Sequence, residues 1–319
     1  MNIVIPGGSG HLGTLLARSF HAKGHRVVVL SRNPQSAPWR VEPWDGKTLG
    51  PWAEALEGAD AVINLAGRSV DCRYDARHRE EMLRSRVDST RAVGQAIKRC
   101  ANPPRVWLQM STATIYAHRF DKPNDERTGL IGGNEPDLPE EWQFSIEVAK
   151  AWEEVFDLTV VPRTRKVKLR TAMVMAPDRD SAFNALLRHI RLGFGRFGDG
   201  RQYVSWIHAR DFVRAVEWLL EDEDAKGTFN LAAPNPLSMT DFLRELAAAA
   251  GRRFLVPLQE WMVKIGAYLA GTEPELVLKS RRVFPTRLLE RGFTFEYPRW
   301  PDAARDLVRA RRGGGSAIF

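Results

Sequence analysis

The chain has 319 residues, 44% hydrophobic and 27% charged, which is enough apolar material for one large globular unit, or for a large and a small domain sharing a cleft. The net charge of +8 is spread along the sequence without an aromatic-basic platform, which argues against a nucleic-acid-binding protein. Two cysteines, Cys72 and Cys100, cannot form a disulfide framework, and no Cys/His cluster has metal-ligand spacing, so we expect no bound metal.

The beginning of the sequence reads directly into a strand. Residues 1–5 contain neither a charged leader nor an apolar signal segment, and no later stretch of about 18 apolar residues could span a membrane. Together with the low cysteine content, these features predict a cytoplasmic protein with no membrane partner.

Short β-rich runs alternate with helical stretches through the first half of the chain. The predicted strands are residues 3–5, 26–30, 61–65, 105–110 and 167–173. Between them, residues 73–100 and 140–156 carry helical periodicity and are rich in good helix formers. This alternation predicts an α/β fold of the Rossmann type, in which helices cover both faces of a doubly wound parallel sheet.

A glycine-rich turn follows the first predicted strand and opens a helix. Residues 6–13 satisfy both the GxGxxG pattern and the GxxGxxG pattern. Glycine permits the tight turn and lets backbone N–H groups approach a pyrophosphate at the helix N-terminus, although a glycine turn without a ligand is the alternative. The expected dinucleotide contacts from this turn are Gly7, Ser9, Gly10, His11, Leu12 and Gly13.

The end of the second predicted strand indicates which dinucleotide binds. An NAD-selective site usually places Asp or Glu there to accept hydrogen bonds from the ribose 2′-hydroxyl. Here the strand ends in Ser31 and Arg32, whose hydroxyl and guanidinium can bind the oxygens of a 2′-phosphate. The sequence therefore predicts NADP(H) as the cofactor; the alternative is that Arg32 is one surface residue among 47 basic ones.

After about residue 176 the pattern changes to an arginine- and glycine-rich loop at 191–201, a strand-like run at 203–207 and mostly helical segments from 209 to 291. We expect a smaller, mainly helical C-terminal substrate cap made of residues 177–202 and 234–312. An NADP-binding Rossmann domain would comprise residues 1–176 and 203–233. Residues 309–319 lack apolar periodicity, and residues 313–319 are predicted to be a flexible tail.

Several longer segments resemble one known superfamily. Residues 62–67, 109–116 and 198–208, followed by Asp211, are similar to the extended or atypical short-chain dehydrogenase/reductases, also described as NAD-dependent epimerase/dehydratases. Residues 144–153, 229–236 and 285–293 resemble a poorly characterised subgroup called epimerase family proteins. The resemblance covers nearly the whole chain. Further cofactor contacts expected from it are Leu65, Ala66, Gly67, Ser111, Lys150 and Met173.

The resemblance also implies the positions of the catalytic groups. Its Ser/Thr position falls on Thr112, by spacing to Tyr116. In most of these enzymes a Tyr-x-x-x-Lys helix supplies the proton, because the Lys lowers the Tyr pKa and holds the ribose. In this chain that register reads Ile146 to Lys150, so Lys150 can hold the ribose but Ile146 cannot transfer a proton.

Replacement proton donors remain open. Tyr116, Glu147 or His208 could serve, or a water positioned by Thr112. We take Thr112, Lys150 and Tyr116 as the candidate catalytic residues.

Two functions are compatible with this sequence. One is an NADP(H)-dependent oxidoreductase or epimerase-like enzyme acting on a small polar substrate, for example a sugar-like one. The other is a non-catalytic NADP(H)-binding sensor or interaction protein whose cap surface changes with cofactor occupancy. A homodimer is left open.

Overall fold

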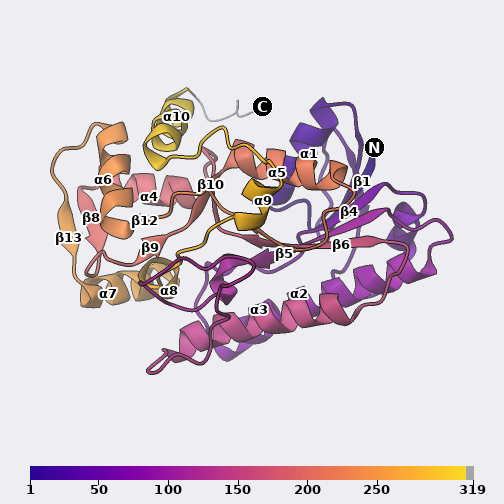
Figure 1. Ribbon diagram of the computed structural model, residues 1–319, viewed down its shortest axis with the longest axis horizontal. Coiled ribbons are helices and arrows are strands. Elements are labelled where there is room, and N and C mark those ends of the chain that lie inside the picture. The colour runs from indigo at the N-terminus through magenta and orange to yellow at the C-terminus, as the bar shows by residue number, and fades with distance from the viewer. Residues whose placement is uncertain (314–319) are drawn as a thin grey trace.

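The computed structural model describes residues 1–313, and its centre is a seven-stranded parallel sheet with the order β11-β6-β5-β4-β1-β2-β3 (Figure 1). These strands are β1 (Asn2–Pro6), β2 (Arg26–Ser31), β3 (Arg40–Pro43), β4 (Ala61–Asn64), β5 (Val106–Thr112), β6 (Arg165–Thr171) and β11 (Gly227–Leu231). The chain moves outward from β1 in one direction and then from β4 in the other. Ligands of open α/β sheets bind at such a switch point, beyond the carboxyl ends of the strands.

Helices cover both faces of the sheet. Figure 1 shows α1 (His11–Ala22) and α5 (Ala209–Glu221) on one face, and α2 (Ala76–Arg99) and α3 (Glu140–Leu158) on the other. Because both faces are covered, every residue of β4 is buried, which explains why this strand reads as a continuous apolar run. The predicted α/β fold with a doubly wound parallel sheet is confirmed.

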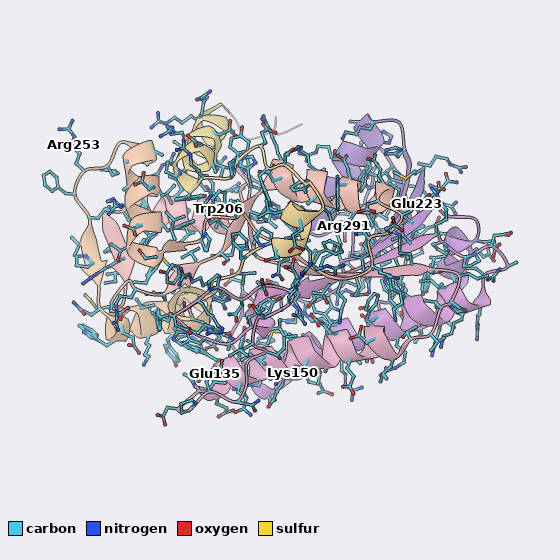
Figure 2. All side chains as sticks on the ribbon, in the orientation of Figure 1. Glu135, Lys150, Trp206, Glu223, Arg253 and Arg291 are labelled. Atoms are coloured by element: carbon cyan, nitrogen blue, oxygen red, sulfur yellow. The ribbon has the colours of Figure 1, made fainter. Side chains whose placement is uncertain are left out.

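A second core lies beside the carboxyl ends of the strands. Trp206 is at its centre (Figure 2), with the Trp300 ring 5.0 Å away and Phe242 stacked on Trp300 at 4.0 Å. Besides α5, the helices after residue 176 are α4 (Ala182–Arg191), α6 (Met239–Ala250), α7 (Glu260–Ala270), α8 (Glu275–Leu278), α9 (Thr286–Glu290) and α10 (Trp300–Arg312). The C-terminal region is therefore mainly helical, as expected for the cap.

Short strands and turns complete the fold. They are β7 (Met173–Met175), β8 (Phe194–Phe197), β9 (Tyr203–Val204), β10 (Trp206–His208), β12 (Leu237–Ser238), β13 (Val256–Leu258) and the 3₁₀ turns η1 (Pro51–Leu56) and η2 (Ala113–Ile115). The strand-like run at 203–207 is thus split into β9 and β10.

The structure differs from the sequence expectations at several places. Strands β3, β11, β12 and β13 were not predicted, and the last three lie in a region expected to be mostly helical. Strand β8 lies within the expected loop at 191–201. Leu288 and Phe293, within the expected cap at 234–312, pack into the core of the main sheet. Residues 309–312 form the last turn of α10 instead of lacking structure, because Leu307 and Val308 anchor that helix in the second core. The predicted flexible tail at 313–319 lies, from residue 314, outside the described residues.

Candidate functional site

The glycine turn between β1 and α1 lies at the switch point of the sheet. Gly7 has φ +74°, and a Cβ on it would lie 2.6 Å from the Ala66 Cα, so both conformation and packing require glycine. A Cβ on Gly13 would lie 2.4 Å from the Gly8 Cα. Gly10 is different, because within 4 Å its Cβ would meet only the Gly7 oxygen, at 3.5 Å. Gly10 therefore borders open space.

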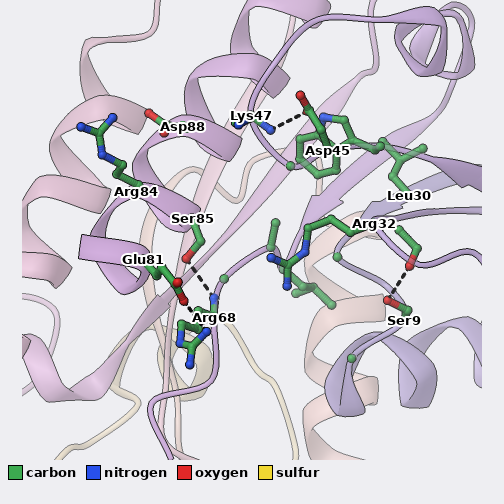
Figure 3. A pocket seen from close by; sticks show the side chains of 18 of the residues that line it. Ser9, Leu30, Arg32, Asp45, Lys47, Arg68, Glu81, Arg84, Ser85 and Asp88 are labelled. Atoms are coloured by element: carbon green, nitrogen blue, oxygen red, sulfur yellow. Dashed lines mark hydrogen bonds and ion pairs between the residues drawn. The ribbon is translucent and has the colours of Figure 1, made fainter. Parts of the chain in front are cut away.

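A first cavity of about 620 Å³ opens above this turn and extends toward α2 (Figure 3). The expected cofactor contacts that line it are Gly7, Ser9, Gly10, Ser31, Arg32, Leu65, Ala66 and Gly67. Gly10 is the N-cap of α1 and has no side chain to cap the helix, so the N–H groups of the first turn can meet an anion. These features fit a dinucleotide pyrophosphate.

Ser31 and Arg32 occupy different environments. Ser31 is buried, and its hydroxyl donates to the Ser9 hydroxyl at 3.0 Å and accepts from the Asn33 N–H at 3.2 Å. Arg32 is exposed, and no carboxylate among the described residues pairs with it; its guanidinium extends toward the middle of the cavity (Figure 3). Arg32 is thus the side chain at the end of β2 that is available to a 2′-phosphate.

Sequence reasoning missed the loop that follows β3. Asp45, Gly46 and Lys47 line the first cavity opposite α2. Asp45 accepts hydrogen bonds from the backbone N–H groups of Lys47 and Thr48, each at 2.9 Å, and from the Thr48 hydroxyl. These bonds hold the Asp45 pKa below its usual range against the opposing effect of burial. Its oxygens are therefore engaged within the loop.

A second cavity of about 360 Å³ adjoins the first, because both are lined by Leu65 and Gly67. Thr112, at the carboxyl end of β5, lines the second cavity, and its hydroxyl oxygen accepts from the Thr114 N–H at 3.1 Å. The hydroxyl proton of Thr112 thus remains available to a ligand. The other expected contact residues that line this cavity are His11, Leu12, Ser111 and Met173.

The acid/base helix does not face the cavity in the predicted register. Ile146 is fully buried, and the Lys150 ammonium lies 2.9 Å from where a Cβ on Gly133 would be. Lys150 lies near Glu135 at the lower edge of the molecule in Figure 2, and neither Ile146 nor Lys150 lines either cavity. One residue along a helix turns a side chain by about 100°. The α3 residues that line the second cavity are Phe144, Ser145, Val148, Ala149 and Trp152.

Tyr116, a candidate proton donor, also lies outside both cavities. Its side chain is buried, and the phenol donates to the Asn230 Oδ1 at 2.9 Å. The Arg170 guanidinium lies over the ring, 4.9 Å from its centroid. Burial raises the Tyr116 pKa, which favours the protonated phenol that donates to Asn230.

The other two proposed donors are placed elsewhere. His208 is fully buried as the N-cap of α5, where its Nδ1 accepts from the Arg210 N–H at 3.1 Å, and its ring stacks on Tyr297. Glu147 is exposed and accepts from the Gln143 amide at 2.9 Å. Neither residue lines either cavity.

Polar residues that the sequence did not reveal complete the second cavity. Tyr74, Arg86, Ser145, Glu275 and Arg281 all line it. They come from four separate parts of the chain, and no local motif connects them. Burial raises the Tyr74 pKa to about 12 and lowers the Arg86 pKa to about 10.

Residues 1–313 contain neither a metal-ligand cluster nor a membrane-spanning helix. No three His, Cys, Asp or Glu side chains of this part gather as they would around a metal ion. None of its helices combines the length and apolar character needed to cross a membrane.

The parallel sheet, the glycine turn at its switch point and the adjoining cavity define a dinucleotide-binding protein of the Rossmann type. The chain belongs to the NAD dependent epimerase/dehydratase family, which it matches over residues 3–232. Residues 260–307 match a domain of unknown function, DUF1731. The resemblance to the epimerase/dehydratases is thereby confirmed.

Relatives match along almost their whole length. Human epimerase family protein SDR39U1 is 28% identical over 312 residues, which cover 97% of this chain and 100% of the relative. Epimerase family protein YfhF of Bacillus subtilis is 28% identical and covers 98% of this chain and 99% of its own. A crystal structure of human SDR39U1 (isoform 2) with NADPH superimposes with a TM-score of 0.84, covering 97% of this chain and 99% of that one.

Proposed function

We propose that this protein binds NADP(H) and is an oxidoreductase or epimerase-like enzyme acting on a small polar, sugar-like substrate. The observation that carries the proposal is the junction of the two cavities at Leu65 and Gly67. A dinucleotide placed along them would extend from Arg32, beside the adenosine ribose, to the cavity lined by Thr112. When bound, the nicotinamide would supply or accept a hydride there.

The residues of each cavity have separate tasks in this proposal. The N–H groups at the start of α1 hold the pyrophosphate, and Arg32 selects the 2′-phosphate. Thr112 orients the substrate oxygen by a hydrogen bond. The relative crystallised with NADPH supports this choice of cofactor.

The decisive experiment is transfer of label from stereospecifically deuterated NADPH to a broad panel of sugars, nucleotide sugars and simple carbonyl compounds. We expect label to appear in at least one class of product. Tight NADPH binding without transfer to any compound would overturn the enzymatic proposal.

One observation favours the non-catalytic alternative. Ile146 and Lys150, which stand at the phenol and ammonium positions of the superfamily pattern, line neither cavity. A sensor would change its surface with cofactor occupancy without any chemical step. Limited proteolysis of the DUF1731 segment with and without NADPH, in parallel with the label-transfer assay, separates the two functions.

A further inference from the structure

The DUF1731 segment contributes a buried carboxyl group to the second cavity. Glu275, the first residue of α8, is 1% exposed and lines this cavity. The Ser145 hydroxyl, from α3, donates to the Glu275 Oε2 at 2.5 Å. The Ser145 oxygen also lies 3.4 Å from the Tyr74 hydroxyl. Three oxygen-bearing side chains from distant parts of the chain thus meet at one wall of the cavity.

The charges around Glu275 come from its own segment. The Arg281 Nη2 lies 3.5 Å and the Lys279 Nζ 3.8 Å from the Glu275 Oε1. Both cations are also bound elsewhere: the Lys279 ammonium donates to the Thr114 carbonyl at 3.0 Å, and the Arg281 Nε donates to the Thr114 hydroxyl at 3.1 Å. These bonds fasten the segment to η2, directly after Thr112.

The protonation of these groups follows from their burial. Burial raises the Glu275 pKa, and this effect exceeds the lowering by Arg281, by Lys279 and by the Ser145 hydrogen bond, while Glu273 adds to the rise. Burial also lowers the Lys279 pKa to about 8. A carboxyl group whose pKa lies above its usual range can hold a proton closer to neutral pH and release it during a reaction.

Ser145 faces the second cavity, but its hydroxyl alone is a poor group for proton transfer. Ser145 lines the cavity, whereas Ile146 and Lys150 do not. An aliphatic hydroxyl is a weak acid and base, and it transfers protons efficiently only when a neighbouring group accepts or supplies them. The hydrogen bond to Glu275 provides that neighbour.

We propose that Glu275, acting through the Ser145 hydroxyl, exchanges the proton of the substrate oxygen in the second cavity; this inference rests on the proposed function. In the reductive direction, the substrate carbonyl carbon accepts a hydride from the reduced nicotinamide dinucleotide, and the C=O π electrons move to the oxygen. When Glu275 is ionised, the Ser145 hydroxyl donates to its Oε2. When Glu275 is protonated, its O–H donates to the Ser145 oxygen and the Ser145 hydroxyl turns to the substrate oxygen. The substrate oxygen takes the Ser145 proton, and Ser145 takes the Glu275 proton. The products are an alcohol, the oxidised dinucleotide and a Glu275 carboxylate that solvent reprotonates.

The first test measures label transfer from deuterated NADPH by the wild type, Glu275→Gln and Ser145→Ala. We expect rates about 100-fold lower in both variants, the usual size of a lost acid/base contribution, with NADPH affinity unchanged. Glu260→Gln is the matched control, because Glu260 is an exposed carboxylate of the same DUF1731 segment, paired with Lys264. Wild-type rates in both cavity variants would overturn this inference and leave the proposed function intact, whereas no transfer by the wild type would overturn both.

The pH profile separates a proton-exchanging role from a structural one. The wild-type reductive rate should fall as pH rises through the Glu275 pKa, and Glu275→Gln should lose that limb. Tyr74, Lys279, Arg281 and Glu273 interact with the same carboxyl group. A limb that survives in Glu275→Gln would belong to one of them and would contradict the inference.

An infrared measurement tests the carboxyl group without any substrate. A pH titration of the difference spectrum, wild type minus Glu275→Gln, should show the C=O band of a protonated carboxyl at pH values where an exposed glutamate is already ionised. Glu126, whose pKa burial also raises, is present in both proteins and cancels. A difference band that titrates at or below about pH 4.3, the usual pKa of Glu, would overturn the inference.

Discussion

Arg32 should determine the preference for NADPH over NADH. Its guanidinium borders the first cavity without a carboxylate partner among the described residues, so no internal ion pair must break when a phosphate binds. The Ser31 hydroxyl, in contrast, is already bonded to Ser9 and to the Asn33 N–H. We therefore assign most of the selectivity to Arg32 and expect Arg32→Ala to weaken NADPH binding specifically.

The size of the effect follows from this exposure. A hydrogen bond to a charged group contributes about 1.5–3 kcal/mol, and 1.4 kcal/mol corresponds to a factor of ten in affinity. Because Arg32 is exposed and solvent screens it, we expect the lower part of this range, a loss of about 10- to 30-fold for NADPH. NADH lacks the 2′-phosphate, so its affinity should change less than about twofold.

Isothermal titration calorimetry of both cofactors measures this difference directly. Arg40→Ala is the control: Arg40 is an exposed arginine on the neighbouring strand β3, pairs with Glu42 and does not line the cavity. It removes the same formal charge and should leave both affinities unchanged. Equal losses of NADPH and NADH in Arg32→Ala, or equal NADPH losses in both variants, would refute the assignment.

Four further substitutions test the geometry of the site and the packing beside it. Gly10→Ala should retain the melting temperature, because its Cβ meets only an ordinary contact, but it should weaken NADPH binding at least tenfold. Gly7→Ala should lower the melting temperature, because Gly7 has φ +74° and its Cβ would lie 2.6 Å from the Ala66 Cα. The buried Glu153 carboxylate accepts from the Arg170 Nε at 2.8 Å and Nη2 at 2.7 Å, and from the Ser111 hydroxyl at 2.6 Å. Glu153→Gln should therefore destabilise the protein by about 3 kcal/mol in urea titrations at neutral pH. Hydrogen bonds and nearby charges keep the Glu153 pKa low despite its burial. The stabilisation by Glu153 is therefore present above about pH 4.3 and is lost as pH falls through its folded-state pKa. An equal loss of stability at acid pH in the variant and the wild type would contradict this. Tyr116→Phe should lower the free energy of unfolding by about 1–2 kcal/mol, because it leaves the Asn230 Oδ1 unpaired. Label transfer should be unaffected; its loss would favour Tyr116 as the proton donor.

Much of the fold could be predicted because its central strands are buried on both faces. Strands such as β4 therefore read as uninterrupted apolar runs between turns. Strand β3 gave no such signal, because Arg40 and Glu42 alternate with apolar residues at the edge of the sheet. Strand β11 contains Gly227 and Asn230, which are uncommon in strands, and only its pairing with β6 reveals it.

The two cavities differ in how far the sequence predicts them. The glycine turn and Arg32 follow directly from the ends of β1 and β2, so local patterns suffice. The face that α3 presents is not determined locally, because Phe144, Ile146 and Val148 distribute apolar side chains around the helix. Glu275 carries no signal at all, since its contact with Ser145 joins residues 130 positions apart.

The lining of the first cavity is confined to a short part of the chain, from Gly7 to Asp88, whereas that of the second extends from His11 to Arg281. Evolution can therefore act on the two halves of the site separately. Substitutions after residue 100 can reshape what the second cavity accepts without altering the walls around the adenosine half. Substrate preference in such a chain is free to diverge while the residues that select the 2′-phosphate are retained.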